Sequence, residues 1–132
     1  MTDRLLRSDG RRPVISVVED DHAMRAALTD LLDAAGCEAR AFPNAEELIA
    51  SPDGLRSDVI VTDIQMGAMD GLSLIEKLKE IAPRRVPVIV ITAMTDDCLR
   101  ERAIAQGCSA FLRKPFDPNV FMEHVSAALE EC

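Results

Sequence analysis

Polar side chains that could do chemistry follow several apolar, β-branched runs of this 132-residue sequence. In chain order they are Glu19, Asp20 and Asp21, then Asp63, then Thr92, and finally Lys114. Carboxylates brought close together repel, and one of them takes up a proton unless a cation offsets the charge. A set of oxygen ligands favours Mg²⁺ over zinc. If these segments meet in space, the sequence predicts a magnesium site.

The same residues could handle a phosphoryl group. Asp63 ends a buried run and could act as a nucleophile that forms an aspartyl phosphate. Lys114 supplies a compact positive charge and Thr92 a hydrogen-bond donor for phosphoryl oxygens. Each of these residues alone has a plainer explanation as loop charge, helix cap, strand-end hydroxyl or surface lysine. Their joint occurrence at successive strand ends favours phosphoryl transfer, which depends mostly on positioning and charge neutralisation.

The elements that must position these residues alternate between two patterns. Short runs at 14–18, 38–41, 59–62, 86–92 and 110–112 predict five strands. The strongest runs lack polar alternation, which is typical of parallel strands covered on both faces. Apolar stripes with helical spacing lie between the runs, and the last predicted helix spans about 118–130.

Capping and stop signals agree with this alternation. Asn44 with Glu47 predicts a helix start, and so does Asp117 with the proline after it. Gly36 and Gly107 stand where helices should end. Five strands alternating with five helices predict an α/β fold, a single doubly wound parallel sheet. Ligands bind at the carboxyl ends of the strands in such sheets, where the chemical residues should meet.

Four segments resemble the signature segments of response-regulator receiver domains. They are VVEDD at 17–21, VTDIQMGAMDG at 61–71, VIVITA at 88–93 and FLRKPF at 111–116. The resemblance covers about residues 13–130. It implies a flavodoxin-like (βα)5 fold with strand order 2-1-3-4-5 and phosphorylation by a histidine kinase or a histidine phosphotransfer protein. We expect a flexible N-terminal lead-in at 1–12 and one receiver domain at 13–132.

The resemblance assigns a role to each acidic-site residue. Asp63 matches the phosphoacceptor. Glu19 and Asp20 match the acidic pair that holds Mg²⁺, together with Asp63 and the backbone carbonyl of Gln65. Counting from the apolar residues places the pair at 19 and 20, and Asp21 stays open as an alternative member.

The resemblance also assigns the switch. Thr92 resembles the switch hydroxyl, Phe111 the switch aromatic and Lys114 the phosphate-binding lysine. Pro115 matches a family cis peptide, Lys114–Pro115. Phosphorylation would then alter the partner preference of the face formed by about residues 96–130, toward a downstream protein, an output domain or a second copy of the chain.

Two positions near the acidic site bear on the switch. Where the family commonly has a proline after the methionine in the loop following the phosphoacceptor, Met66 is followed here by Gly67, which puts the rigidity of this loop in doubt. Met94 lies two residues after Thr92, at a position that tunes water access in the family. We expect its bulk to slow self-dephosphorylation.

Composition excludes several classes of function. With 15 Lys and Arg against 23 Asp and Glu, the net charge is −8, so direct nucleic-acid binding is not expected. No apolar stretch is long enough to span a bilayer, and no signal peptide is evident. The four cysteines show no metal-ligand spacing. We expect a cytoplasmic protein.

Three alternatives are less well supported. A haloacid-dehalogenase-type phosphohydrolase needs a second acid two residues after its nucleophile, where this chain has Gln65. A flavin-binding module would want a hydroxyl- and glycine-rich loop in place of Glu19–Asp21, and a pseudo-receiver should lack phosphorylation residues. We therefore expect no enzyme beyond self-phosphorylation and self-dephosphorylation. The chain could be a stand-alone regulator or the receiver portion of a longer, possibly DNA-binding, response regulator.

Overall fold

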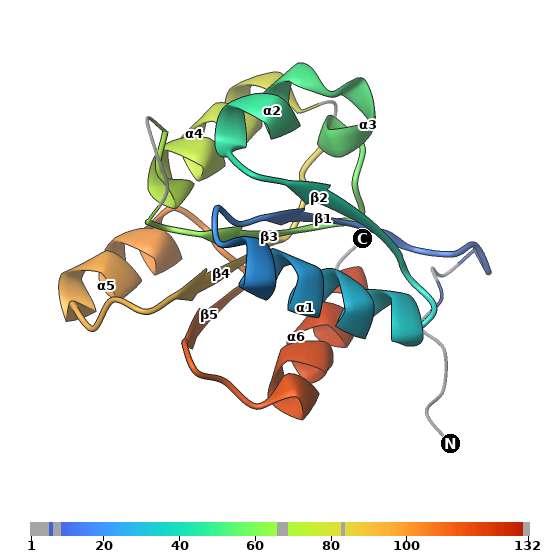
Figure 1. Cartoon of the computed structure of the whole chain (residues 1–132). Helices are drawn as coiled ribbons and strands as arrows, with labels where there is room; N and C mark the ends of the chain where they lie inside the picture. The colour runs from blue at the N-terminus through green and yellow to red at the C-terminus, as the bar shows by residue number, and fades with distance from the viewer. Residues whose placement is uncertain (1–5, 7–8, 66–68, 83, 131–132) are drawn as a thin grey trace.

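The sheet follows the strand order predicted from the resemblance. The structure, a computed structural model, describes residues 6, 9–65, 69–82 and 84–130. Its strands are β1 (Val14–Val18), β2 (Glu38–Phe42), β3 (Val59–Asp63), β4 (Val88–Thr92) and β5 (Ala110–Arg113). All four strand pairings are parallel, in the order β2-β1-β3-β4-β5 (Figure 1). The α/β prediction is therefore confirmed.

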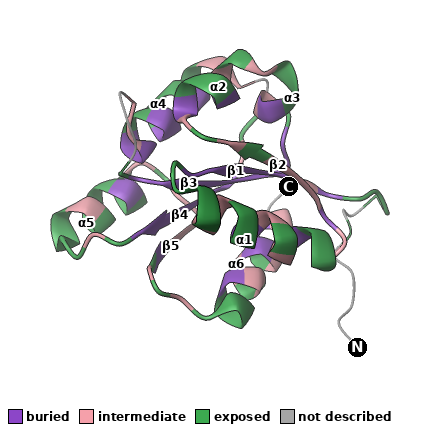
Figure 2. Cartoon of the chain, in the orientation of Figure 1, coloured by how far each residue is buried: buried purple, intermediate pink, exposed green. Residues whose placement is uncertain are grey.

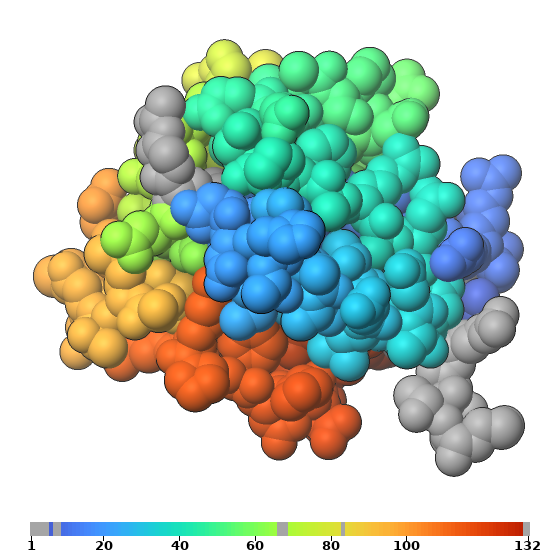
Figure 3. Space-filling model, in the orientation of Figure 1, coloured from blue at the N-terminus to red at the C-terminus, as the bar shows by residue number. Residues whose placement is uncertain are grey.

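Helices cover both faces of the sheet. They are α1 (His22–Ala34), α2 (Ala45–Ala50), α3 (Pro52–Leu55), α4 (Gly71–Ile81), α5 (Asp97–Ala105) and α6 (Pro118–Glu130). One apolar cluster joins α1 and α6 to the sheet, and a second joins α2, α4 and α5 to its other face. In the space-filling view the blue surface of α1 lies beside the red-orange surface of α6 (Figure 3). None of the helices in the described ranges is long and apolar enough to cross a membrane.

The prediction of five helices is wrong for the segment between β2 and β3. Two short helices, α2 and α3, occupy it, so the described residues form six helices. Pro52 is the cause, because proline forces the residue before it into extended geometry. Ser51 has φ −99° and ψ 115°, and its side chain accepts a hydrogen bond from the Gly54 N–H, which starts α3.

The fourth strand is shorter than predicted, because it begins at Val88 and not at residue 86. Pro87 has no N–H to donate to a neighbouring strand. Its carbonyl still accepts a hydrogen bond from the Ile60 N–H at 3.0 Å. The regular ladder therefore starts one residue later.

The predicted helix boundaries are confirmed. The Asn44 side chain accepts a hydrogen bond from the Glu47 N–H at 2.9 Å, and Asp117 accepts one from the Asn119 N–H at 2.7 Å. Gly36 and Gly107 have φ of 91° and 94°, the left-handed geometry that ends a helix after α1 and α5.

The flexible lead-in at residues 1–12 stays a prediction. Arg12, its last residue, donates hydrogen bonds to the carbonyls of Gly36 and Cys37 at 3.1 and 2.9 Å. Arg12 is thus tied to the end of α1.

The central strands fix the position of everything at their ends. Every residue of β3 and β4 is buried, as the purple arrows show (Figure 2). Burial on both faces explains why these runs are apolar except near their carboxyl ends, where β3 has Thr62 and Asp63 and β4 has Thr92. The packed strands therefore hold the residues at their carboxyl ends in fixed positions.

Gly71, at the start of α4, sits against the end of β3, and we expect Gly71→Ala to destabilise the fold. Its N–H donates to the Ile64 carbonyl at 3.0 Å, and an added Cβ would lie 2.5 Å from the Asp63 carbonyl oxygen. Such overpacking should lower the free energy of unfolding by about 1–3 kcal/mol. Urea unfolding followed by circular dichroism measures it. Ser73→Ala, an exposed change in the same helix, is the control, and equal stability of the two variants would contradict the prediction.

Candidate functional site

The sheet brings the predicted acidic residues together. Glu19 and Asp20 follow β1, and Asp63 is the last residue of β3. Parallel pairing sets Val18 opposite Thr62, so these two strands end side by side. One carboxylate oxygen from each of the three acids lies within 4.8 Å of the others.

Lys114 lies among these carboxylates although it is about 50 residues from the nearest of them in sequence. Its Nζ donates to Asp63 Oδ2 at 2.8 Å and to Glu19 Oε1 at 2.5 Å. The Glu19 and Asp63 side chains are buried, and the Lys114 side chain is only 14% exposed. This partly buried ion triad ties the ends of β1, β3 and β5 together.

Burial and charge shift the pKa values in the triad. Burial raises the pKa of Glu19 to about 7; Lys114 acts to lower it, and the negative charge of Asp63 acts to raise it. Burial alone would lower the pKa of Lys114, but its hydrogen bonds and ion pairs with Asp63 and Glu19 outweigh that effect and raise it. Lys114 is therefore a permanent cation at this site.

The residues present fit a divalent cation. Three carboxylates face one ammonium group, which leaves excess negative charge. Glu19 Oε2 is buried and has no hydrogen-bond partner within the described part of the chain. A buried carboxylate oxygen without a partner is costly unless a cation or a proton satisfies it. An oxygen-only set of this kind suits a hard cation such as Mg²⁺.

Asp21 takes a different role from its two neighbours. Its side chain accepts a hydrogen bond from the Ala23 N–H at 3.1 Å and caps the start of α1. The carboxylate group near Asp63 contains Glu19 and Asp20 and does not include Asp21. The geometry thus favours Glu19 and Asp20 as the acidic pair over a pair that includes Asp21.

The other predicted site residues surround Asp63. The exposed Gln65 donates its N–H to Asp63 Oδ1 at 3.0 Å. The buried Thr92 hydroxyl accepts a hydrogen bond from the Met94 N–H at 3.1 Å, and the Thr92 carbonyl accepts one from the Lys114 N–H at 2.8 Å. Thr92 and Lys114 therefore hold β4 and β5 together beside the acids.

The remaining predictions concern β5 and the loop after β3. Phe111 is half-buried and packs against the apolar cluster on the α4 and α5 side of the sheet. The Lys114–Pro115 peptide bond is cis, in agreement with what the resemblance implies. Met66 and Gly67 lie outside the described residues, so the question that Gly67 raises about the rigidity of that loop stays open.

Sequence reasoning missed Arg25. Its Nη1 donates to the Glu19 carbonyl oxygen at 2.8 Å, and its Nη2 lies 3.1 Å from His22 Nδ1. Side chains in a helix point back toward its N-terminus. An arginine in the first turn of a helix that follows the acidic pair was the available signal.

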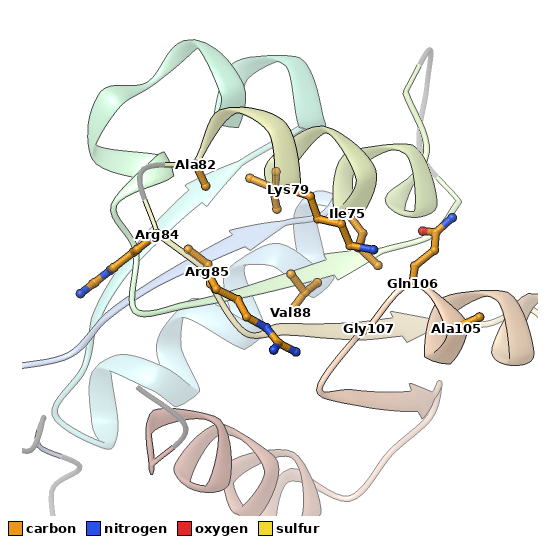
Figure 4. A pocket seen from close by; sticks show the side chains of 11 residues that line it. Ile75, Lys79, Ala82, Arg84, Arg85, Val88, Ala105, Gln106 and Gly107 are labelled. Atoms are coloured by element: carbon orange, nitrogen blue, oxygen red, sulfur yellow. The ribbon is translucent and has the colours of Figure 1, made fainter.

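A separate cavity lies at the other end of the strands, near the start of β4. It has a volume of about 540 Å³ between α4, the start of β4 and the end of α5 (Figure 4). Apolar Ile75, Leu78 and Val88 line it, and Lys79 and Arg85 flank it. It contains none of the predicted site residues, so it is not the site of the predicted phosphoryl chemistry.

Comparison with known families decides the class of the protein. The family model of the response regulator receiver domain matches residues 15–126. This chain belongs to that family. Receiver domains of this family act in two-component systems as signalling domains and are not generally classed as enzymes.

Two curated relatives show how much of a longer protein a receiver domain can represent. The DNA-binding transcriptional regulator NtrC of Salmonella typhimurium is 37% identical over 107 residues, which cover 81% of this chain and 23% of NtrC. The transcriptional regulatory protein FixJ of Bradyrhizobium diazoefficiens is 31% identical over 118 residues, which cover 89% of this chain and 57% of FixJ. The chain thus spans about a quarter of NtrC and somewhat over half of FixJ.

Solved structures agree on the fold. The crystal structure of FixJ-N superposes with a TM-score of 0.82 at 30% identity, covering 92% of this chain and 97% of that one. The Vibrio cholerae chemotaxis protein CheY4 superposes with a TM-score of 0.80 at 23% identity, covering 89% and 98% of the two chains. The second likeness concerns the fold alone.

Stabilisation by Mg²⁺ should depend on pH. Folding raises the pKa of Glu19 from 4.5 to about 7, so protonation of Glu19 stabilises the folded state. This stabilisation is fully present below pH 4.5 and is lost as the pH rises through 7. A cation must displace that proton, so apparent Mg²⁺ affinity should be about tenfold weaker at pH 6 than at pH 8. Thermal unfolding with and without Mg²⁺ at both pH values measures it.

The control variant is Glu19→Gln, which has no proton to displace. Its weaker Mg²⁺ stabilisation should be the same at both pH values. Equal stabilisation of the unaltered protein at pH 6 and pH 8 would contradict the assignment.

Proposed function

We propose that this chain is a phosphoacceptor switch in which Asp63 receives a phosphoryl group from a histidine kinase or a histidine phosphotransfer protein. The observation that carries the proposal is the convergence of Asp63, Glu19, Asp20 and Lys114 at one edge of the sheet. A nucleophilic carboxylate beside a fixed cation is the arrangement that in-line phosphoryl transfer requires.

In the proposed transfer, a carboxylate oxygen of Asp63 forms a bond to phosphorus as the phosphorus–nitrogen bond of the donor phosphohistidine breaks. The departing imidazole keeps the electron pair and takes up a proton. Lys114, whose Nζ is already 2.8 Å from Asp63 Oδ2, pairs with an oxygen of the transferred group. Mg²⁺ held by Glu19, Asp20, Asp63 and the Gln65 carbonyl would supply the remaining charge neutralisation.

The proposed switch begins at Thr92. Its hydroxyl accepts a hydrogen bond from the Met94 N–H, and a hydroxyl that accepts one bond can still donate its own proton, here to a phosphoryl oxygen on Asp63. Movement of Thr92 toward that oxygen would open space for the half-buried Phe111 to move inward. The face formed by α5, β5 and α6 would then change its preference for a downstream protein, an output domain or a second copy.

The proposal covers residues 13–132 as the receiver domain and leaves two settings for it. The chain works as a stand-alone regulator or as the receiver portion of a longer response regulator. NtrC is a DNA-binding transcriptional regulator and FixJ is a transcriptional regulatory protein, and both likenesses support a longer, DNA-binding protein. In that case the output domain, and not this acidic chain, contacts DNA.

Intact-mass analysis after incubation with acetyl phosphate and Mg²⁺ tests the proposal. We expect one phosphoryl group per chain, no gain without Mg²⁺ and no gain in Asp63→Asn. Asp33→Asn, which neutralises an exposed acid on α1, is the matched control and should be labelled normally. An unlabelled native chain that steadily releases phosphate from unrelated monoesters would instead indicate a phosphohydrolase.

Met94 should set the lifetime of the phosphorylated form. Its backbone N–H donates a hydrogen bond to Thr92 Oγ1, and its side chain is partly buried. We propose that the bulk of this side chain hinders the approach of water to the phosphorylated Asp63. We expect Met94→Ala and Met94→Glu to lose the phosphoryl group severalfold faster, as measured by intact mass after the donor is removed. The exposed Thr95→Ala is the control. An unchanged lifetime in both Met94 variants would refute this role.

A further inference from the structure

Arg25 connects helix α1 to the backbone of the acidic site. It lies in the first turn of α1, which Asp21 caps, and its half-buried side chain turns back toward the end of β1. There its guanidinium donates to the Glu19 carbonyl oxygen at 2.8 Å, and its other terminal nitrogen lies 3.1 Å from His22 Nδ1. A guanidinium holds such acceptors in a fixed planar arrangement.

The Glu19 backbone is thereby held on both sides. Its N–H donates to the carbonyl of Phe42, at the end of β2, at 3.1 Å. Its carbonyl accepts from Arg25. That carbonyl belongs to the peptide group that joins Glu19 to Asp20, so Arg25 sets the plane of this group. The plane in turn sets the direction in which the Asp20 side chain leaves the backbone.

Asp20 depends on this backbone more than the other two acids do. Glu19 and Asp63 are buried and bonded to Lys114. Asp20 is exposed, and among the residues the structure describes no hydrogen bond or ion pair orients its carboxylate. Its place beside Glu19 and Asp63 therefore rests on the peptide group that Arg25 holds.

We propose that Arg25 is a positioning residue for the divalent-cation site, acting through the Glu19 carbonyl to aim the carboxylate of Asp20. The proposal rests on the proposed function, because it concerns the same acidic site. A positioning role and a simple charge effect predict opposite changes in the cation affinity. A nearby guanidinium charge repels a cation, so as a charge alone Arg25 would weaken cation binding. As a positioning residue it strengthens binding.

Mn²⁺ is a suitable probe, because it takes the same oxygen ligands as Mg²⁺. The concentration of free Mn²⁺ can be measured from its electron paramagnetic resonance signal. We expect Arg25→Ala to bind Mn²⁺ about tenfold more weakly than the unaltered chain. Arg25→Lys, which keeps the charge and one donor group, should bind with intermediate affinity. Lys79→Ala removes an equal charge at the other end of the strands and should leave the affinity unchanged.

Thermal unfolding without metal separates positioning from folding. The Arg25 variants should unfold near the temperature of the unaltered chain while their Mn²⁺ affinities differ. Equal or tighter Mn²⁺ binding by Arg25→Ala would overturn the proposal. If that variant does not fold, Arg25→Lys decides, and an affinity equal to that of the unaltered chain overturns it. A native chain that binds no Mn²⁺ overturns it as well.

The failure of the proposed function would be a different result. In that case the native chain binds Mn²⁺ with an affinity that depends on Arg25, yet Asp63 gains no phosphoryl group from acetyl phosphate. The positioning role would then stand for a cation site with another use.

Discussion

The ion triad of Lys114 with Glu19 and Asp63 is the constraint around which the carboxyl edge of the sheet is organised. Bringing several carboxylates together and removing them from water is costly unless cations and hydrogen bonds compensate. Lys114 compensates part of this cost through two short contacts. Glu19 Oε2 remains without a partner among the described residues, and the pKa of Glu19 is raised to about 7. The site is thus prepared for a further cation.

The buried central strands hold the site residues in place, whereas helix α5 is less firmly packed against the sheet. The completely buried strands β3 and β4 hold Asp63 and Thr92 in fixed positions. Helix α4 buries five residues against the sheet, including Gly71 beside the end of β3, whereas α5 buries Ala103 alone. A helix with few buried contacts can move at low cost. The proposed response to phosphorylation therefore includes a helix with few buried contacts, α5.

Local patterns in the sequence predicted most of the fold, and long-range contacts explain what they missed. The uniformly apolar runs indicated parallel strands, and Gly36 and Gly107 marked the ends of α1 and α5. The break between α2 and α3 also has a local cause, the proline at position 52. The bond from Arg25 to Glu19 could not be inferred from spacing alone, because it depends on how α1 leaves β1.

The sequence by itself determined the family, the strand order that the family implies, and the chemical types of the site residues. The family and the site chemistry follow from the residues of the signature segments, and the strand order is what membership of the family implies. Tertiary structure decided which of three consecutive acids share a site, since Asp21 caps α1 while Glu19 and Asp20 group with Asp63. It also raised the pKa of Glu19, because burial depends on what packs around a residue, and Asp63 and Lys114 are brought beside Glu19 from far along the chain.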